Sequence, residues 1–223
     1  MRYINFHTHY PPADTKPEIA IVSCVAPEPL QQCPPGIWLS YGIHPWYILH
    51  SNMTNLIEKV KTLAHNQQVI AIGEAGLDKL RGPAMDIQRQ IFCQQIDISE
   101  TTQKPLIIHS VKANNEILSL RKKRKPLQPW IIHGFNGLPQ EMEQLIKEDF
   151  YLSFGPRIFY SDSKAANSLK AIPSDRFFLE TDHTNKSISA LYLRAAEIRG
   201  ISTQELEEII ENNFRRLFGN IIE

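Results

Sequence analysis

Eight short apolar runs recur along the chain, and they restrict its fold more than any other feature of the sequence. Most of them are continuously apolar rather than alternating, which is typical of parallel strands that are covered on both faces. We therefore expect eight strands in a parallel sheet. The runs are Tyr3–His9, Ile19–Val25, Ile37–Ile43, Val69–Gly73, Pro105–His109, Trp130–His133, Phe150–Phe154 and Phe177–Glu180.

Segments with helical periodicity separate most of these runs. The last segment begins beside Ser202 and Glu205, whose spacing is that of a capping box. Strands that alternate with helices indicate an α/β fold, and eight such strands predict a (β/α)8 barrel of the TIM type. The expected helices are Asn52–His65, Ala84–Thr102, Lys112–Arg121, Pro139–Lys147, Ser163–Ala171, Ser187–Arg199 and Thr203–Leu217.

The first two connections of the barrel depart from this pattern. Tyr10–Glu18 and Ala26–Gly36 are rich in proline, which breaks helices. They are also short compared with a usual parallel crossover, which needs about a dozen or more residues. We therefore expect the first two crossover helices to be shortened or missing. The sequence shows no repeat, linker or low-complexity segment, which predicts a single domain over residues 1–223.

Composition excludes several classes of function. The chain has 24 Lys and Arg against 24 Asp and Glu, so its net charge does not attract nucleic acid or anionic membranes as a whole. No apolar run is long enough to span a bilayer, and no obligate protein partner is evident. The cysteines Cys24, Cys33 and Cys93 cannot all pair with one another, and the polar histidines come too early for a secretion signal. These features predict reduced thiols in a cytoplasmic protein.

Polar side chains stand where the apolar runs end. His7 and His9 close the first run, and residues two apart in a strand point to the same face, about 6–7 Å from each other. The carboxyl ends of the strands meet on one face of a closed barrel, where barrel enzymes keep their chemistry. We therefore expect one shared metal site. The other strand ends carry His44, Glu74, His109, His133 and Asp182.

The number of candidate ligands exceeds the three that a catalytic zinc ion usually takes from protein. The ligands are the imidazoles of His7, His9, His109 and His133 and the carboxylates of Glu74 and Asp182. Two ions with a bridging carboxylate account for this count better than one. The sequence therefore predicts one or two divalent ions, with Mg²⁺, Mn²⁺ and Zn²⁺ left open. Such ions activate water near neutral pH and bind phosphate oxygens.

The chain resembles the TatD-like metal-dependent hydrolases, within the amidohydrolase-like barrels. The resemblance rests on His7–His9, Gly42–Pro45, Ile72–Asp78, Lys104–Ser110, His133–Gly137, Leu179–Asp182 and Asn213–Gly219. It implies a TIM-type barrel, one or two divalent metals and phosphodiester hydrolysis of DNA, often from the 3′ end. It also implies that the six candidate ligands bind metal and that His44 contacts phosphate or substrate.

Several positions differ from the family pattern. Tyr10 and Pro11 replace an aspartate, and Val111 replaces an arginine. Lys79 and Leu80 replace aromatic residues, with Arg81 expected to serve nearby as a substrate contact. His183 and Thr184 replace Ala-Pro, and His183 either contacts substrate or faces solvent.

Two carboxylates are expected to act in catalysis. Asp182 is the candidate general base beside the attacking water as well as a ligand, and Glu74 is the second. By contrast, Asp78 is expected to orient a loop and Glu180 to be a buried structural carboxylate. The cationic run Arg121–Lys125 is expected to be a solvated face.

The expected activity is that of a phosphodiesterase or deoxyribonuclease, with DNA as the substrate. Trp46 and Tyr47 follow His44, where they either stack on a nucleobase or cover the region left bare by the missing helices. Two alternatives remain open. One is an amidohydrolase that acts on a small amide, ester or lactone with the same activated water. The other is a non-catalytic metal-binding barrel.

Overall fold

A computed structural model describes residues 3–12, 18–48, 53–219 and 221. It confirms the predicted α/β fold of the TIM-barrel type. The order of the eight strands follows their order in the sequence, and their described pairs are parallel. Seven α-helices lie among the described residues, and their ends differ from the predicted ones by at most three residues. Asn52, the first residue of one predicted helix, lies outside the described residues.

The chain divides into two compact units. Unit 1 comprises Met1–Val22, Cys33–Ile37 and His133–Glu223, and unit 2 comprises Ser23–Gln32 and Trp38–Ile132. The single domain expected over residues 1–223 stays a prediction.

Unit 1 contains the first and the last strands of the sheet. Its strands are β1 (Tyr3–Thr8), the first part of β2 (Glu18–Val25), β7 (Phe150–Phe154) and β8 (Phe177–Leu179). Ser153 of β7 pairs with Phe178 of β8, and an isolated bridge joins Thr8 to Asp182. Its helices are α4 (Pro139–Lys147), α5 (Lys164–Ala171), α6 (Ile188–Arg199), α7 (Thr203–Phe218) and the 3₁₀ turn η2 (Pro156–Phe159).

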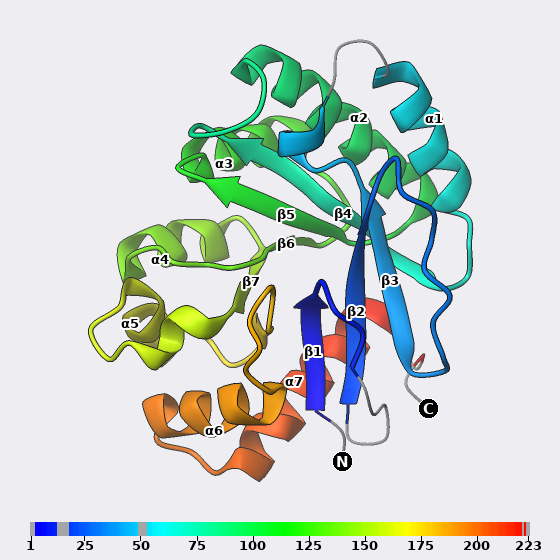
Figure 1. The fold of residues 1–223 in the computed structure, drawn as a ribbon. Coiled ribbons are helices and arrows are strands. Elements are labelled where there is room, and N and C mark those ends of the chain that lie inside the picture. Colours follow the sequence, from blue (N-terminus) through cyan, green and yellow to red (C-terminus); the bar gives the residue numbers. More distant parts are fainter. Residues whose placement is uncertain (1–2, 13–17, 49–52, 220, 222–223) are drawn as a thin grey trace. The chain divides into compact units, whose positions relative to one another are not determined.

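Aromatic packing fixes β1 in unit 1, where α6 and α7 lie beside this strand (Figure 1). Phe6 of β1 stacks on Phe178 of β8 with 4.1 Å between ring centroids. From α6, the buried Tyr192 hydroxyl accepts the Ile4 peptide N–H at 3.0 Å and donates to the Ile4 carbonyl at 3.2 Å. These contacts hold the strand that leads to His7.

Unit 2 contains the middle of the sheet. Its strands are β3 (Ile37–Gly42) from Trp38 onward, β4 (Val69–Asp78), β5 (Leu106–Val111) and β6 (Trp130–Ile132). Its helices are α1 (Met53–Leu63), α2 (Met85–Thr102), α3 (Asn114–Arg124) and the 3₁₀ turn η1 (Pro45–Tyr47). Helix α2 packs against β4, and α1 packs against α2 (Figure 1).

Strand β4 is longer than the sequence predicts, because it continues past Gly73 to Asp78. Its register against β5 shifts between Ile72 and Ala75. Gly76 has φ +152°, and a Cβ atom there would lie 2.0 Å from the His109 carbonyl oxygen, so β4 and β5 approach too closely for any other residue. Because β4 extends to Asp78, Glu74 lies within the strand rather than at its end.

A buried amide links α2 to the end of β3. Gln95 is fully buried; its Oε1 accepts the Ile43 peptide N–H at 2.7 Å and its Nε2 donates to the Ile43 carbonyl at 3.0 Å. Both backbone groups would otherwise be buried without a hydrogen bond. Gln95 therefore fixes the backbone that presents His44.

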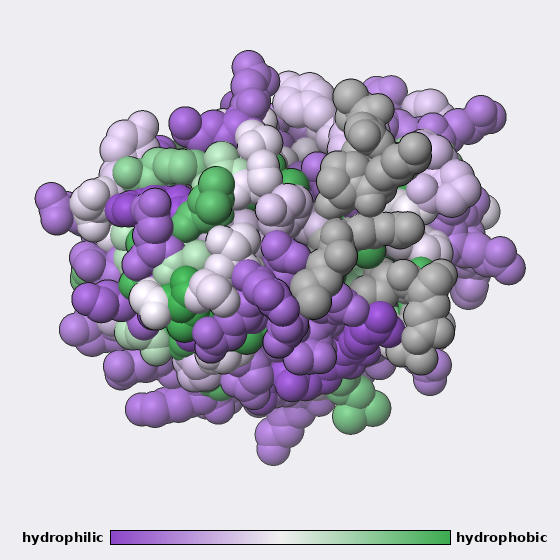
Figure 2. Space-filling model, turned by 90° about the horizontal axis from the view of Figure 1, so that it is seen from below, coloured by the Kyte–Doolittle hydropathy of each residue, from purple (hydrophilic) through white to green (hydrophobic). Residues whose placement is uncertain are grey.

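The second connection confirms the expected loss of a helix. Between β2 and β3, residues 26–36 form turns and irregular structure without a helix. In the first connection, residues 13–17 lie outside the described residues. None of the helices in the described part of the chain combines the length and apolar character needed to cross a membrane. The face shown in Figure 2 is mostly hydrophilic, as expected when the apolar runs are buried.

Candidate metal centre

In unit 1, the ends of β1 and β8 bring two histidines to one aspartate. The Asp182 peptide N–H donates to the His7 carbonyl at 3.0 Å, and the His9 N–H donates to the Asp182 carbonyl at 3.2 Å. Asp182 Oδ1 lies 3.9 Å from His7 Nε2 and 3.4 Å from His9 Nε2. The backbone bonds therefore fix the spacing of the carboxylate and both imidazoles.

His133 completes this group from the residue that follows β6. Its ring centroid lies 4.3 Å from that of His7, and ligand atoms of His7, His133 and Asp182 all lie within 4.8 Å of one another. Behind it, the fully buried Glu180 accepts the Gly134 peptide N–H at 2.7 Å and lies 3.5 Å from His133 Nδ1. A carboxylate in this position typically orients a metal-binding histidine. The expectation that Glu180 is buried is confirmed.

His183 adds an imidazole to the edge of the unit 1 group. It stacks on His9 with 3.6 Å between ring centroids and lies 3.9 Å from Asp182 Oδ1, although its side chain is 63% exposed. His183 faces solvent, which was one of the two alternatives for it. It also lies beside the donor side chains, so its role as a substrate contact stays a prediction.

Unit 2 holds a second group of donors, formed by His44, Glu74 and His109, and all three are buried. Glu74 Oε1 lies 3.5 Å from His44 Nε2 and 3.4 Å from His109 Nδ1, and these two nitrogens lie 3.2 Å apart. The Ser23 hydroxyl donates to the other oxygen of Glu74 at 3.4 Å. His44 therefore lies as close to Glu74 as His109 does; its role as a substrate contact stays a prediction.

Asp78 supports this second group. Its Oδ1 accepts the peptide N–H groups of Leu80 and Arg81, which confirms that it orients the loop. Its Oδ2 lies 3.2 Å from His109 Nε2 and accepts the Trp46 indole N–H at 2.6 Å, two contacts that the sequence did not indicate. Burial opposes ionisation of Asp78, but the hydrogen bonds from Trp46, Leu80 and His109 outweigh it and lower the pKa of its carboxyl group.

The donor set suits a divalent metal. Unit 1 supplies the predicted ligands His7, His9, His133 and Asp182, and unit 2 supplies Glu74 and His109. Each group joins imidazole nitrogens to a carboxylate, the ligand combination of zinc and manganese sites. In each, a second buried carboxylate lies behind one histidine, as in characterised metal centres.

We expect the Asp78→Asn substitution to weaken metal binding by roughly 10- to 100-fold, because an amide no longer holds His109 as the carboxylate does. Calorimetric titration of the metal-stripped protein with Mn²⁺ or Zn²⁺ measures this change. Asp86→Asn, a charge-matched change of an exposed residue on α2, is the control. Equal affinities of the two variants would show that Asp78 acts only on the loop.

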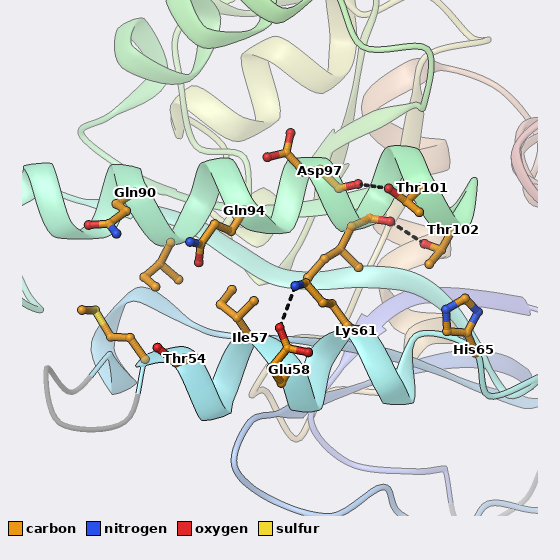
Figure 3. A pocket seen from close by; sticks show the side chains of 13 residues that line it. Thr54, Ile57, Glu58, Lys61, His65, Gln90, Gln94, Asp97, Thr101 and Thr102 are labelled. Carbon is orange, nitrogen blue, oxygen red and sulfur yellow. Dashed lines mark hydrogen bonds and ion pairs between the residues drawn. The ribbon is translucent and has the colours of Figure 1, made fainter.

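A groove of about 480 Å³ lies elsewhere in unit 2, between α1 and α2 (Figure 3). Glu58 and Lys61 form an ion pair on its α1 wall, and the Thr101 hydroxyl donates to the Asp97 carbonyl on its α2 wall. None of the predicted site residues lines this groove. Its polar groups therefore belong to a helix surface and not to the candidate centre.

Comparison with known proteins identifies related sequences and folds. Residues 26–219 match the model of a family described as TatD related DNase. An uncharacterised metal-dependent hydrolase from Buchnera aphidicola is 33% identical over 76% of this chain, and the chain spans 62% of that relative's length. Human deoxyribonuclease TATDN3 is 26% identical over 89% of this chain and 74% of its own length.

A solved structure shares the fold over nearly all of both chains. The crystal structure of YjjV, a TatD homologue from Escherichia coli, superposes with a TM-score of 0.84. It covers 97% of this chain and 98% of the other, at 21% sequence identity. At that identity the likeness concerns the fold alone, and it agrees with the TIM-type barrel.

Proposed function

Because the chain belongs to the TatD-related DNase family and is thus a metal-dependent hydrolase, we propose that it hydrolyses phosphodiester bonds in DNA. The observation that carries the proposal is the group formed by His7, His133 and Asp182, whose ligand atoms all lie within 4.8 Å of one another. The name of the human relative, a deoxyribonuclease, supports DNA as the substrate.

We propose that the six predicted ligands bind metal. They are His7, His9, His133 and Asp182 of unit 1 and Glu74 and His109 of unit 2. When bound there, one or two divalent ions would lower the pKa of water and stabilise negative charge on the phosphate. Mg²⁺, Mn²⁺ and Zn²⁺ are all candidates, because imidazole and carboxylate donors suit each of them to some degree.

Asp182 is the proposed general base. Its side chain is 32% exposed, so water reaches it, while the backbone bonds to His7 and His9 hold it in place. The carboxylate takes the proton of the water that attacks phosphorus. The bond from phosphorus to the leaving sugar oxygen then breaks, and that oxygen takes up a proton from solvent to leave as a hydroxyl group. Glu74, which is 2% exposed, is the second catalytic carboxylate and serves by holding the imidazoles of unit 2.

His44, Trp46 and Arg81 are the proposed substrate contacts, and all three belong to unit 2. The ring centroids of His44 and Trp46 lie 4.8 Å apart, and the Arg81 guanidinium lies over the Trp46 ring. We also propose that the protein acts in the cytoplasm, since its three cysteines cannot all pair with one another within the chain.

A second candidate substrate is a small amide, ester or lactone. The half-buried Val111 supports it, since this position on β5 offers no cation to a phosphate. The same carboxylate base would then assist attack of water on carbonyl carbon. This candidate needs no nucleobase or phosphate contact from Trp46 or Arg81.

A substrate panel tests the proposal. The protein, supplied with Mn²⁺, Mg²⁺ or Zn²⁺, is offered single-stranded DNA, bis(4-nitrophenyl) phosphate and 4-nitrophenyl acetate. We expect cleavage of both phosphodiesters and little of the acetate. Turnover of the acetate alone would favour the small-molecule hydrolase, and bound metal without any turnover would favour the non-catalytic barrel.

A further inference from the structure

We propose that Arg81, stacked on Trp46, binds a phosphate group of the substrate and makes unit 2 selective for nucleotides over neutral amides and esters. The inference rests on the proposed function and names the chemical class that the site selects. It is carried by the position of a single guanidinium relative to the unit 2 donors.

The platform for Arg81 is fixed by hydrogen bonds. The Arg81 guanidinium carbon lies 3.9 Å from the centroid of the Trp46 ring. The Trp46 indole N–H donates to Asp78, and the same carboxylate oxygen contacts His109. The ring therefore stands next to the proposed metal ligands, with 5.6 Å between the centroids of Trp46 and His109.

The backbone of Arg81 is held as firmly as the ring beneath it. Its N–H donates to Asp78 Oδ1 at 3.0 Å, and its carbonyl accepts the side-chain amide of Gln88 at 3.2 Å. Gln88 is 1% exposed and also donates to the Pro83 carbonyl at 2.8 Å. A loop fixed in this way presents a side chain with little loss of conformational entropy on binding.

The charge of Arg81 is available to a ligand. Among the described residues, no carboxylate forms an ion pair with its guanidinium, whereas the neighbouring Lys79 is paired with Glu116 at 2.6 Å. The Arg81 side chain is exposed, and so are Leu80, which precedes it in the chain, and Tyr47, which follows Trp46. Arg81 is thus a cation without an acidic partner among the described residues. The exposed Leu80 beside it in the chain offers apolar surface to a nucleobase.

The geometry of the guanidinium selects phosphate. The N–H groups of a guanidinium lie in its own plane. When the guanidinium stacks on an indole, these groups point outward, past the edge of the ring. Two parallel N–H groups then bind two phosphate oxygens, which a neutral carbonyl group cannot match. Trp46 serves as the support of the cation, which accounts for its place beside His44 better than a cover for missing helices does.

Binding of thymidine 5′-monophosphate and of thymidine tests the inference. Calorimetry uses the protein as purified and again after removal of metal, so that phosphate bound to metal is separated from phosphate bound to Arg81. For R81Q we expect the monophosphate to bind roughly 10- to 100-fold more weakly and thymidine to bind as before. R81K keeps the positive charge but lacks the two parallel N–H donors, so its affinity for the monophosphate should lie between those of R81Q and the unaltered protein. R89Q, an exposed arginine on α2, is the matched control.

Each outcome separates this inference from the proposed reaction. Equal monophosphate binding by R81Q and the unaltered protein overturns the inference, as does an unaltered protein that prefers thymidine. If R81Q loses the monophosphate but no phosphodiester is cleaved by the unaltered protein, the phosphate site stands and the proposed reaction fails. If phosphodiesters are cleaved and R81Q binds normally, the reaction stands and the phosphate lies elsewhere.

Discussion

Asp182→Asn is expected to lower kcat for phosphodiester cleavage by roughly a hundredfold to ten-thousandfold, the range that a positioned general base supplies. Asparagine keeps the shape of the side chain and one oxygen ligand, but it cannot take a proton from water. The backbone contacts of Asp182 with His7 and His9 do not involve the side chain, so the strands should keep their places. Steady-state kinetics with bis(4-nitrophenyl) phosphate measures the change.

Asp162→Asn is the control for this substitution. Asp162 is an exposed carboxylate of the same unit, and neutralising it changes the net charge equally without touching the donor group. We expect Asp162→Asn to keep the kcat of the unaltered protein. A normal kcat for Asp182→Asn would remove Asp182 from the role of base and leave it, at most, a ligand.

Glu74→Ala is expected to have the second large effect, a loss of bound metal together with a loss of activity. Glu74 Oε1 lies 3.5 Å from His44 Nε2 and 3.4 Å from His109 Nδ1, so its removal takes away the carboxylate that both imidazoles share. The effect on metal affinity should exceed the roughly 10- to 100-fold cost of changing a residue behind a ligand. Elemental analysis of the purified variant gives the metal content per chain.

Glu74→Gln separates loss of a ligand from loss of fold, since the amide fills the same buried space and still accepts a bond from Ser23. Glu58→Gln changes an exposed partner of Lys61 on α1 and should keep full metal content and activity. A Glu74→Gln protein with normal metal content and normal turnover would contradict the assignment of Glu74 as a ligand.

The sequence predicted the elements of the fold because their signals are local. Continuous apolar runs and capping residues lie within single strands and helices, and Ser202, for instance, does cap α7 by accepting the Glu205 N–H. The extension of β4 to Asp78 was missed because Gly73 and Gly76 look like breaks in a strand. Their role is instead the close approach to β5, which depends on a partner distant in the sequence.

The sequence predicted which histidines lie near Asp182 better than it predicted the side chains that support the candidate ligands. His7, His9, His133 and Asp182 lie together in unit 1 as expected, because short motifs at strand ends carry them. The contact of Asp78 with His109 joins residues 31 apart, and nothing in the spacing indicates it. Arg121 was expected to be solvated together with the cations that follow it, but its side chain is buried. Its guanidinium carbon lies 5.4 Å from the centroid of the Trp130 ring.

The proposed activity of this chain is hydrolysis of phosphodiesters with a bound divalent metal. It is tested by cleavage of a short single-stranded DNA labelled at its 3′ end, with and without added Mg²⁺ or Mn²⁺, for the unaltered protein and for Glu74→Ala. We predict that cleavage requires the metal and disappears in Glu74→Ala. Cleavage that persists in excess chelator, or that Glu74→Ala carries out as fast as the unaltered protein, would contradict a metal-dependent reaction that needs Glu74.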